Sequence, residues 1–290
     1  MELILSTIIN GLSLGGIYAM IALGYTMVYG IAKMLNFAHG DIIMVGGYII
    51  YVFVAISNPI VAILMAVIFC ILLGVCIEKI AYKPLRGASP LAVLITAIGV
   101  SYLLQSTAQI IFGSANKMVM VYDFGTVQFM GANVQISSLV TLGVAFVVMT
   151  ALTLFVKYTR IGRAMIAVSE DKGAAQLMGI NVNMIITVTF AIGSALAALA
   201  GLFYLFKAPS ISSTLGAMPG IKAFTAAVIG GIGSLPGAML GGLFIGMIET
   251  IAQVVPGMGA YTIAIEFLVL IVVLLVRPTG ILGKKRREKV

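Results

Sequence analysis

Charged residues are scarce in this sequence: Asp, Glu, Lys and Arg make up 9% of its 290 residues, while hydrophobic residues make up 61%. Soluble domains carry about 25% charged residues. A lipid bilayer can accommodate so much apolar surface, at about 20 apolar residues for each spanning helix. The composition therefore predicts one transmembrane domain over residues 1–290, with room for about eight to ten crossings and no separate soluble domain.

The residues that build metal centres and disulfide frameworks are also rare. The chain has one histidine, and its two cysteines, Cys70 and Cys76, lie inside one apolar segment. We therefore expect no metal site and no structural disulfide. No nucleophile motif accompanies His39 and Asp41, which argues against an enzyme.

Three further absences narrow the function. The net charge is +8, but no basic face interleaved with aromatic residues is present, so we expect no nucleic-acid partner. No basic residue precedes Lys33, so the start lacks the n-region of a cleaved signal peptide, and the first hydrophobic segment is expected to remain. No G-x-x-x-x-G-K-[ST] loop occurs, so we expect no bound cofactor and no ATP hydrolysis by this chain.

What the chain does contain is a series of apolar runs. They lie at about 3–31, 38–56, 60–78, 91–112, 138–156, 184–206, 221–232, 238–255 and 260–276. Run 221–232 is too short to span a bilayer and is expected to be a half-helix or re-entrant segment. The predicted fold is all-α, a polytopic transmembrane helical bundle of about eight spans plus this half-helix.

Basic residues predict the orientation of the bundle, because they concentrate on the cytoplasmic side. We place four segments on one side of the membrane: the segment around Lys33, residues 79–86, residues 157–172 and the basic tail 277–290. Together they hold 14 of the 17 Lys and Arg residues. The remaining three, Lys117, Lys207 and Lys222, then fall on the other side. The C-terminus and the loop at about 157–183 are thus expected in the cytoplasm, and the N-terminus outside.

The longest external loop, about 113–137, alternates apolar and polar residues on both sides of Gly131. This alternation predicts a small β-hairpin on the membrane surface. We expect it to cover an external gate.

Two polar or glycine-rich interruptions are candidates for a substrate pathway. Unwound backbone at membrane depth is tolerated only where it is buried in protein or lines a watery cavity, and paired interruptions in the two halves of a transporter point to its binding site. We expect the interruptions at 36–41 and 230–237 to meet near the membrane midplane; plain cytoplasmic turns are the alternative. The candidate residues are Asn36, His39, Gly40, Asp41, Gly231, Gly233 and Ser234.

A polar stripe and two acids also lie within apolar runs. Ser101, Gln105 and Gln109 share one helix face at a spacing of four residues, so they either bond to neighbouring helices or line the pathway. Glu249 and Glu266 are scattered and are expected near an interface rather than in a proton relay.

The cytoplasmic loop predicts a short docking helix at about 170–178. Ser169 is a suitable N-cap, and Gly179 stands where a glycine would end the helix. A helix this short needs a surface on which to dock; a connector lying on the lipid surface is the alternative. The coupling residues proposed from this loop are Arg163, Ser169, Ala174, Ala175, Leu177, Met178 and Gly179.

Several motifs resemble a known family. Ala174-Ala175-x-x-x-Gly179 is similar to the coupling-loop signature of ABC importer permeases, although Gly173 stands where a Glu is usual. Further motifs resemble, in order along nearly the whole chain, the Liv family of branched-chain amino acid ABC transporter permeases: they lie at 35–40, 83–87, 162–165, 178–181, 222–234, 236–242 and 277–283.

This resemblance implies an importer subunit in the bacterial inner membrane. It implies a second, related permease, two cytoplasmic ATPases that bind ATP, and an extracytoplasmic substrate-binding protein. The substrate would be a zwitterion with an aliphatic tail, for which Tyr18, Tyr25 and Tyr29 on one face of the first helix are expected to form part of an apolar wall. The alternatives are a permease of the same family for urea, short amides or another small polar nutrient, and an ATP-independent carrier or channel.

The orientation can be tested by cysteine labelling. Cysteines introduced at positions 117 and 125 should react with an impermeant thiol reagent in intact cells, because these positions lie in the predicted external loop. Cysteines at 171 and 286 should react only after permeabilisation. Equal labelling at all four positions would contradict the orientation derived from the basic residues.

Overall fold

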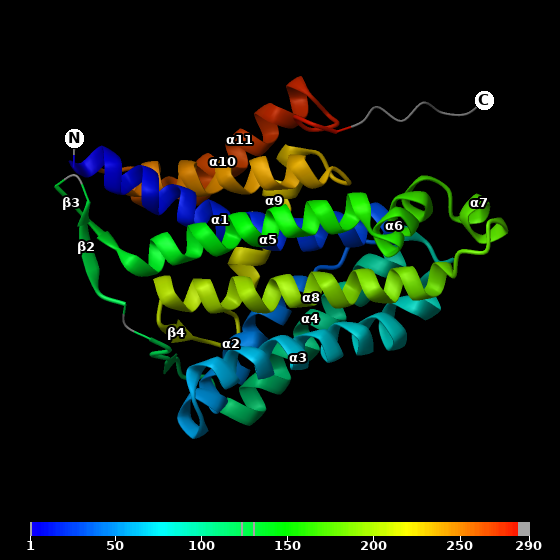
Figure 1. Ribbon diagram of the computed structural model, residues 1–290, viewed down its shortest axis with the longest axis horizontal. Coiled ribbons are helices and arrows are strands. Elements are labelled where there is room, and N and C mark those ends of the chain that lie inside the picture. Colours follow the sequence, from blue (N-terminus) through cyan, green and yellow to red (C-terminus); the bar gives the residue numbers. More distant parts are fainter. Residues whose placement is uncertain (1, 123, 130, 284–290) are drawn as a thin grey trace.

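Eight helices in the described part of the computed structural model are long and apolar enough to cross a membrane (Figure 1). The structure describes residues 2–122, 124–129 and 131–283. The helices concerned are α1 (Glu2–Ala32), α2 (His39–Ile56), α3 (Pro59–Ile77), α4 (Pro90–Phe112), α5 (Ile136–Tyr158), α8 (Val182–Lys207), α10 (Leu235–Val254) and α11 (Thr262–Val276). The spanning segment of α3 continues to Leu85, and that of α11 begins at Gly259, in the 3-10 turn before it. A ninth apolar helix, α9 (Ala217–Gly230), is shorter. The predicted all-α bundle of eight spans and one half-helix is confirmed.

Side-chain caps explain where several helices begin. Asn58, Ser89, Asn181 and Ser234 precede α3, α4, α8 and α10, and each accepts a hydrogen bond from a backbone N–H in the first turn. Such caps satisfy donors that the helix itself leaves unpaired. Ser234, a candidate pathway residue, therefore has a structural role at the start of α10.

Helix α1 forms the centre of the bundle and packs against α5, α8, α9 and α10. Its closest neighbour is α10, where glycines allow the two backbones to approach each other. A Cβ atom added at Gly15 would lie 2.7 Å from the Leu243 Cα, and Gly242 and Gly246 face Ala19 and Gly15 in the same way. These small-residue contacts are the usual means of close helix packing in membranes.

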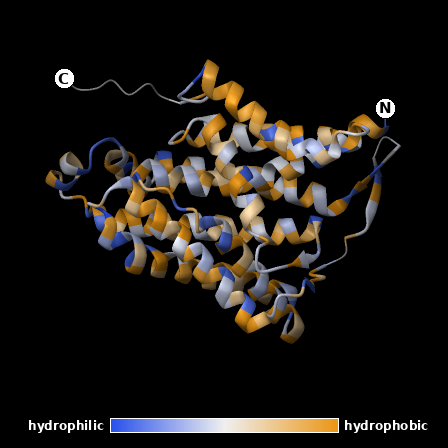
Figure 2. Ribbon diagram, turned by 180° about the vertical axis from the view of Figure 1, so that it is seen from behind, coloured by the Kyte–Doolittle hydropathy of each residue, from blue (hydrophilic) through white to orange (hydrophobic). Residues whose placement is uncertain are grey.

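The outer helices are rich in hydrophobic residues (Figure 2). Helices α3, α4, α5 and α11 each expose large hydrophobic side chains, such as Ile110 and Leu275. These faces suit contact with lipid or with another membrane subunit.

The two ends of the bundle differ (Figure 1). One end carries the N-terminus and the predicted hairpin, which forms from β2 (Thr126–Phe129) and β3 (Ala132–Gln135) in antiparallel pairing. The other end carries α6 (Arg160–Glu170), α7 (Lys172–Leu177) and residues 277–283. The hairpin and the docking segment therefore lie at opposite ends, as predicted. The predicted basic tail beyond residue 283 lies outside the described residues.

A second strand pair was not predicted. β1 (Lys117–Met118) pairs with β4 (Ser210–Ile211), so the loop after α4 is joined to the segment that precedes α9. The pair is antiparallel and very short. The partners lie far apart in the sequence, and neither alternates over a length that would show as a strand.

The docking segment differs from its prediction in one respect. Ser169 does not cap a helix; it lies inside α6, where its hydroxyl donates to the Ile166 carbonyl. Asp171 is the cap of α7, since its carboxylate accepts hydrogen bonds from the Gly173 and Ala174 N–H groups. The predicted helix at about 170–178 is α7, and α6 is an additional helix that ends where the backbone becomes extended at Asp171.

The end of α7 agrees with the prediction. Gly179 has a φ of +82°, a conformation that glycine adopts without strain. The Gly179 N–H bonds to the Gln176 carbonyl and the Ile180 N–H bonds to the Ala175 carbonyl. This pair of bonds is a Schellman cap.

Candidate functional site

Helix α2 begins in the middle of the bundle rather than at its end. Its first residue, His39, lies against Gly24 of α1 and Gly193 of α8. Gly193 is the twelfth of the 26 residues of α8, so His39 stands near half the length of that helix. The predicted interruption at 36–41 is therefore inside the bundle and is not a turn at its surface.

The segment that leads to this point returns from the end of α1 into the interior. Lys33 takes a positive φ of 60° as the chain leaves α1. Asn36, which is buried, accepts a hydrogen bond of 2.8 Å from the Tyr82 hydroxyl of the π-helical turn Glu78–Tyr82. The His39 N–H then bonds to the Asn36 carbonyl. These hydrogen bonds pair backbone and side-chain polar groups inside the bundle, where lipid offers no hydrogen-bond partner.

A second helix, α9, starts at the same place. After α8 the chain runs inward through β4 to Gly216, the residue before α9. Gly216 and Gly220 lie against Gly40 with their backbones in contact, and a Cβ atom added at Gly40 would lie 3.2 Å from the Gly220 Cα. Two helices thus begin at one point inside the bundle, each with the positive end of its dipole there.

The interruption at 230–237 does not meet 36–41 in the way we expected. Gly231 lies at the far end of α9, against Thr279 and Gly283. Since α9 has 14 residues, about 21 Å separate its two ends. The segment that meets Gly40 is the one ending at Gly216, which the sequence does not mark with a comparable glycine run.

Asp41, in the first turn of α2, is the acid nearest this junction. Its carboxylate accepts a 2.8 Å hydrogen bond from Gln105 and a further bond from Ser101, both on α4. One turn farther along α4, Gln109 donates to the Ser213 hydroxyl at 3.1 Å. The predicted polar stripe therefore bonds to neighbouring segments: Gln105 and Ser101 hold Asp41, and Gln109 holds the segment before α9.

His39 is held by one ring nitrogen. A ring N–H donates to the Ile21 carbonyl, and Nε2 has no hydrogen-bond partner in the described structure. The ring packs edge-on against Tyr25, with centroids 4.7 Å apart. Tyr25 in turn bonds through its hydroxyl to the Gly40 backbone. His39 and Tyr25 thus fix the start of α2 against α1.

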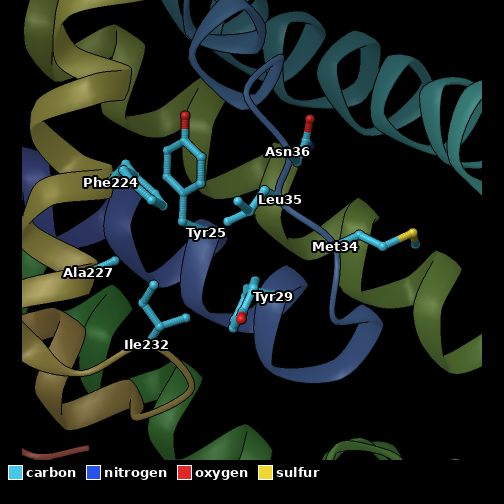
Figure 3. Close-up of a pocket in the computed structure, with 8 residues that line it drawn as sticks. All are labelled: Tyr25, Tyr29, Met34, Leu35, Asn36, Phe224, Ala227 and Ile232. Carbon is cyan, nitrogen blue, oxygen red and sulfur yellow. The ribbon is translucent and has the colours of Figure 1, made fainter. Parts of the chain in front are cut away.

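A small cavity lies beside this junction (Figure 3). Its volume is about 10 Å³, enough for the centre of one water-sized sphere. The lining residues are Tyr25, Tyr29, Met34, Leu35, Asn36, Phe224, Ala227 and Ile232. The cavity brings one residue from each predicted interruption, Asn36 and Ile232, to one mostly apolar wall. Two of the three predicted wall tyrosines are here; Tyr18 is elsewhere.

A group of charged residues inside the bundle was missed. Lys222 of α9 forms ion pairs with Glu249 of α10 at 2.8 Å and with Glu266 of α11 at 3.2 Å. Lys222, which was expected on the external side, lies inside the bundle, and the two acids, which were expected to be scattered, share it as a partner. The sequence could have predicted this group, because a lysine and two acids lie within apolar runs, and opposite charges in such runs are expected to pair.

The docking segment exposes an apolar tip. Leu177 and Met178 are 90% and 82% exposed, whereas Ala175 is 4% exposed and packs inward. Lys172 anchors α7 to the end of α1, since its ammonium donates to the Ala32 carbonyl at 2.8 Å. Burial, with the nearby Arg86 as a smaller cause, lowers the pKa of Lys172 from its usual value. Of the coupling residues named above, Arg163, Ala174, Leu177, Met178 and Gly179 are exposed.

The junction combines two helix N-termini with a small, mostly apolar cavity. Two helix N-termini favour negative charge there, and the cavity adds an apolar wall. In the described part of the chain, no group of three or more His, Cys, Asp or Glu is placed to hold a metal ion.

Comparisons with known proteins agree with this picture. Residues 7–274 match the family model described as the permease component of the branched-chain amino acid transport system. The chain is 43% identical to the high-affinity branched-chain amino acid permease BraD of Pseudomonas aeruginosa, over 99% of this chain and 98% of that protein. It is 40% identical to the permease LivH of Escherichia coli K12, over 99% and 97%.

A solved structure shows the same fold. The chain superposes on an inward-facing putative metal-chelate type ABC transporter with a TM-score of 0.52, over 95% of this chain and 88% of that one. The sequence identity between them is 15%, so this likeness concerns the fold alone.

The contacts of Asp41 generate a prediction about stability. Gln105→Leu removes a donor from a buried carboxylate and should cost about 2–3 kcal/mol, whereas Gln109→Leu removes a bond between neutral groups and should cost about 1 kcal/mol. Thermal unfolding of the purified protein measures both. In an Asp41→Asn background, the stability lost on Gln105→Leu should become smaller. If Gln105→Leu and Gln109→Leu cost the same stability in the wild-type background, Gln105 does not stabilise the charge of Asp41.

Proposed function

Because the chain belongs to the branched-chain amino acid permease family and is a LivH-like permease subunit of an ABC importer, we propose that it moves branched-chain amino acids across the bacterial inner membrane. The observation that carries this proposal is the similarity to BraD and LivH over 99% of the chain. It extends through the interior starts of α2 and α9 and through the docking segment. Family membership also decides against an ATP-independent carrier or channel.

The interior junction suits the proposed substrate. A branched-chain amino acid carries a carboxylate, an ammonium group and an aliphatic side chain. The N-termini of α2 and α9 suit the carboxylate, Asp41 suits the ammonium group, and Tyr25, Tyr29 and Phe224 suit the aliphatic part. The described cavity is far smaller than an amino acid, so we propose that α2 and α9 move apart at Gly40 and Gly216 during passage.

Energy is proposed to enter through α7. This helix stands at the end opposite the hairpin, with Leu177 and Met178 exposed, and Lys172 connects it to α1. A movement of α7 would therefore be passed to the end of α1 and to the segment 33–38. We propose that a partner ATPase binds the exposed tip, and that ATP is bound by that partner and not by this chain.

The remaining partners follow from the importer assignment. We propose a second, related permease, two ATPases and an extracytoplasmic binding protein that meets the hairpin end. The pairing of β1 with β4 joins that end to the segment before α9. The C-terminus and α7 then lie in the cytoplasm and the N-terminus outside.

The substrate assignment predicts the outcome of transport by the reconstituted complex. Proteoliposomes that contain this permease, its partner subunits and the binding protein should take up leucine, isoleucine and valine only with ATP inside. An excess of urea or acetamide should not reduce the uptake, because neither carries the charges or the branched chain. Uptake of urea that leucine fails to inhibit would assign the chain to a different substrate within the same family.

The coupling assignment predicts a loss of ATPase binding. Leu177→Asp combined with Met178→Asp should reduce copurification of the ATPase and leucine uptake by at least about tenfold, since desolvating a charge in an apolar contact costs more than 1.4 kcal/mol. Met258→Asp is the matched control, as Met258 is 45% exposed between α10 and α11. Normal copurification with the double variant would show that α7 is not the docking site.

A further inference from the structure

The ion-paired group inside the bundle has an unbalanced charge. Lys222 contributes one positive charge, and Glu249 and Glu266 contribute two negative charges when ionised. The side chains of Lys222 and Glu249 are 11% exposed and that of Glu266 is 2% exposed. A net negative charge at such depth in a spanning bundle is costly unless a further group neutralises it.

The neighbouring groups leave Glu266 without a hydrogen-bond donor. Glu249 accepts hydrogen bonds from the Tyr18 hydroxyl at 2.6 Å and from Gln253 at 3.3 Å. In contrast, neither oxygen of Glu266 has a hydrogen-bond donor in the described structure, although Lys222 lies within ion-pair distance. Tyr204 and Lys207 of α8 also face the group, and no ion pair within 4 Å joins Lys207 to either acid.

The two carboxyl groups lie on the same ammonium, since Lys222 Nζ is 2.8 Å from an oxygen of Glu249 and 3.2 Å from an oxygen of Glu266. Carboxylates carry only acceptors when ionised, so two of them can form a hydrogen bond only if one holds a proton. A single proton would supply the donor that Glu266 lacks. It would also bring the summed charge of the three ion-paired side chains, Lys222, Glu249 and Glu266, to zero.

We propose that Glu249 and Glu266 bind one proton between them, and that the protonated pair with Lys222 is a latch that joins α9 to α10 and α11. The three residues come from three helices, so the latch connects the half-helix α9 to the peripheral helix α11. The proton is the ligand, and the site is separate from the proposed substrate junction at Gly40 and Gly216. Loss of the proton leaves an unbalanced negative charge and weakens the attachment of α11.

The proposal gives a definite pH dependence. The folded protein holds one proton at a pH where free glutamate side chains in the unfolded chain have released theirs. Stability falls with rising pH wherever the folded state binds more protons than the unfolded state. The melting temperature of the assembled complex should therefore fall as the pH rises through the range in which the pair releases its proton, and Glu266→Gln should flatten this dependence.

Infrared difference spectroscopy on the assembled complex in nanodiscs tests the proton directly. At neutral pH the wild-type protein should show a carbonyl band of a protonated carboxylic acid. The band should disappear in Glu249→Gln and also in Glu266→Gln, because the carboxyl group that remains in either variant faces Lys222 alone and ionises. Loss in both variants is the mark of a shared proton.

Two further variants complete the test. Glu78→Gln is the control, since Glu78 is buried, forms an ion pair with Arg86 and accepts a hydrogen bond from Thr187, and the band should persist. Lys222→Gln should enlarge the band, because neutrality then requires a second proton. The proposal is overturned if the wild-type protein shows no such band, or if only one of the two glutamate variants loses it.

Discussion

The rest of the architecture depends on the contact between Gly40 and Gly216, where two helices start inside the bundle. A helix start leaves backbone N–H groups unpaired, and such groups are tolerated at membrane depth only inside protein. Glycine at both positions lets the backbones touch, and Gly24 and Gly193 make the space that His39 fills. The short length of α9 and the inward path of residues 208–216 follow from this contact, because the chain must return to the middle before α9 can begin.

Charges inside the bundle are balanced locally, in a different way at each position. Asp41 lies at a helix start and accepts from Ser101 and Gln105, so polar donors and a dipole stabilise it. Lys222 instead pairs with acids from two other helices. The first arrangement lies where a substrate would pass, and the second holds the helix that borders the passage. Both join separate helices: α2 to α4 in the first arrangement, and α9 to α10 and α11 in the second.

The sequence predicted the spans, the half-helix, the hairpin and the docking segment closely. Each of these is a local property: apolar length predicts a span, alternation predicts a hairpin, and a glycine such as Gly179 predicts a helix end. The prediction was wrong where two local signals competed. Ser169 and Asp171 are both suitable caps, and only the extended backbone at Asp171 decides between them. The roles proposed for Gly231 and Gly233 in the pathway stay predictions.

The sequence by itself determined that the chain spans a membrane about eight times, and its motifs indicated the family, since hydropathy and motifs are read along the chain. Only the tertiary structure decided which interruptions meet and which charges pair. Tyr18 and Glu249 are 231 residues apart, and no local pattern joins them. The physical reason is that helix length and hydropathy are properties of neighbouring residues, whereas the depth of a helix start and the partner of a buried charge depend on how the helices pack.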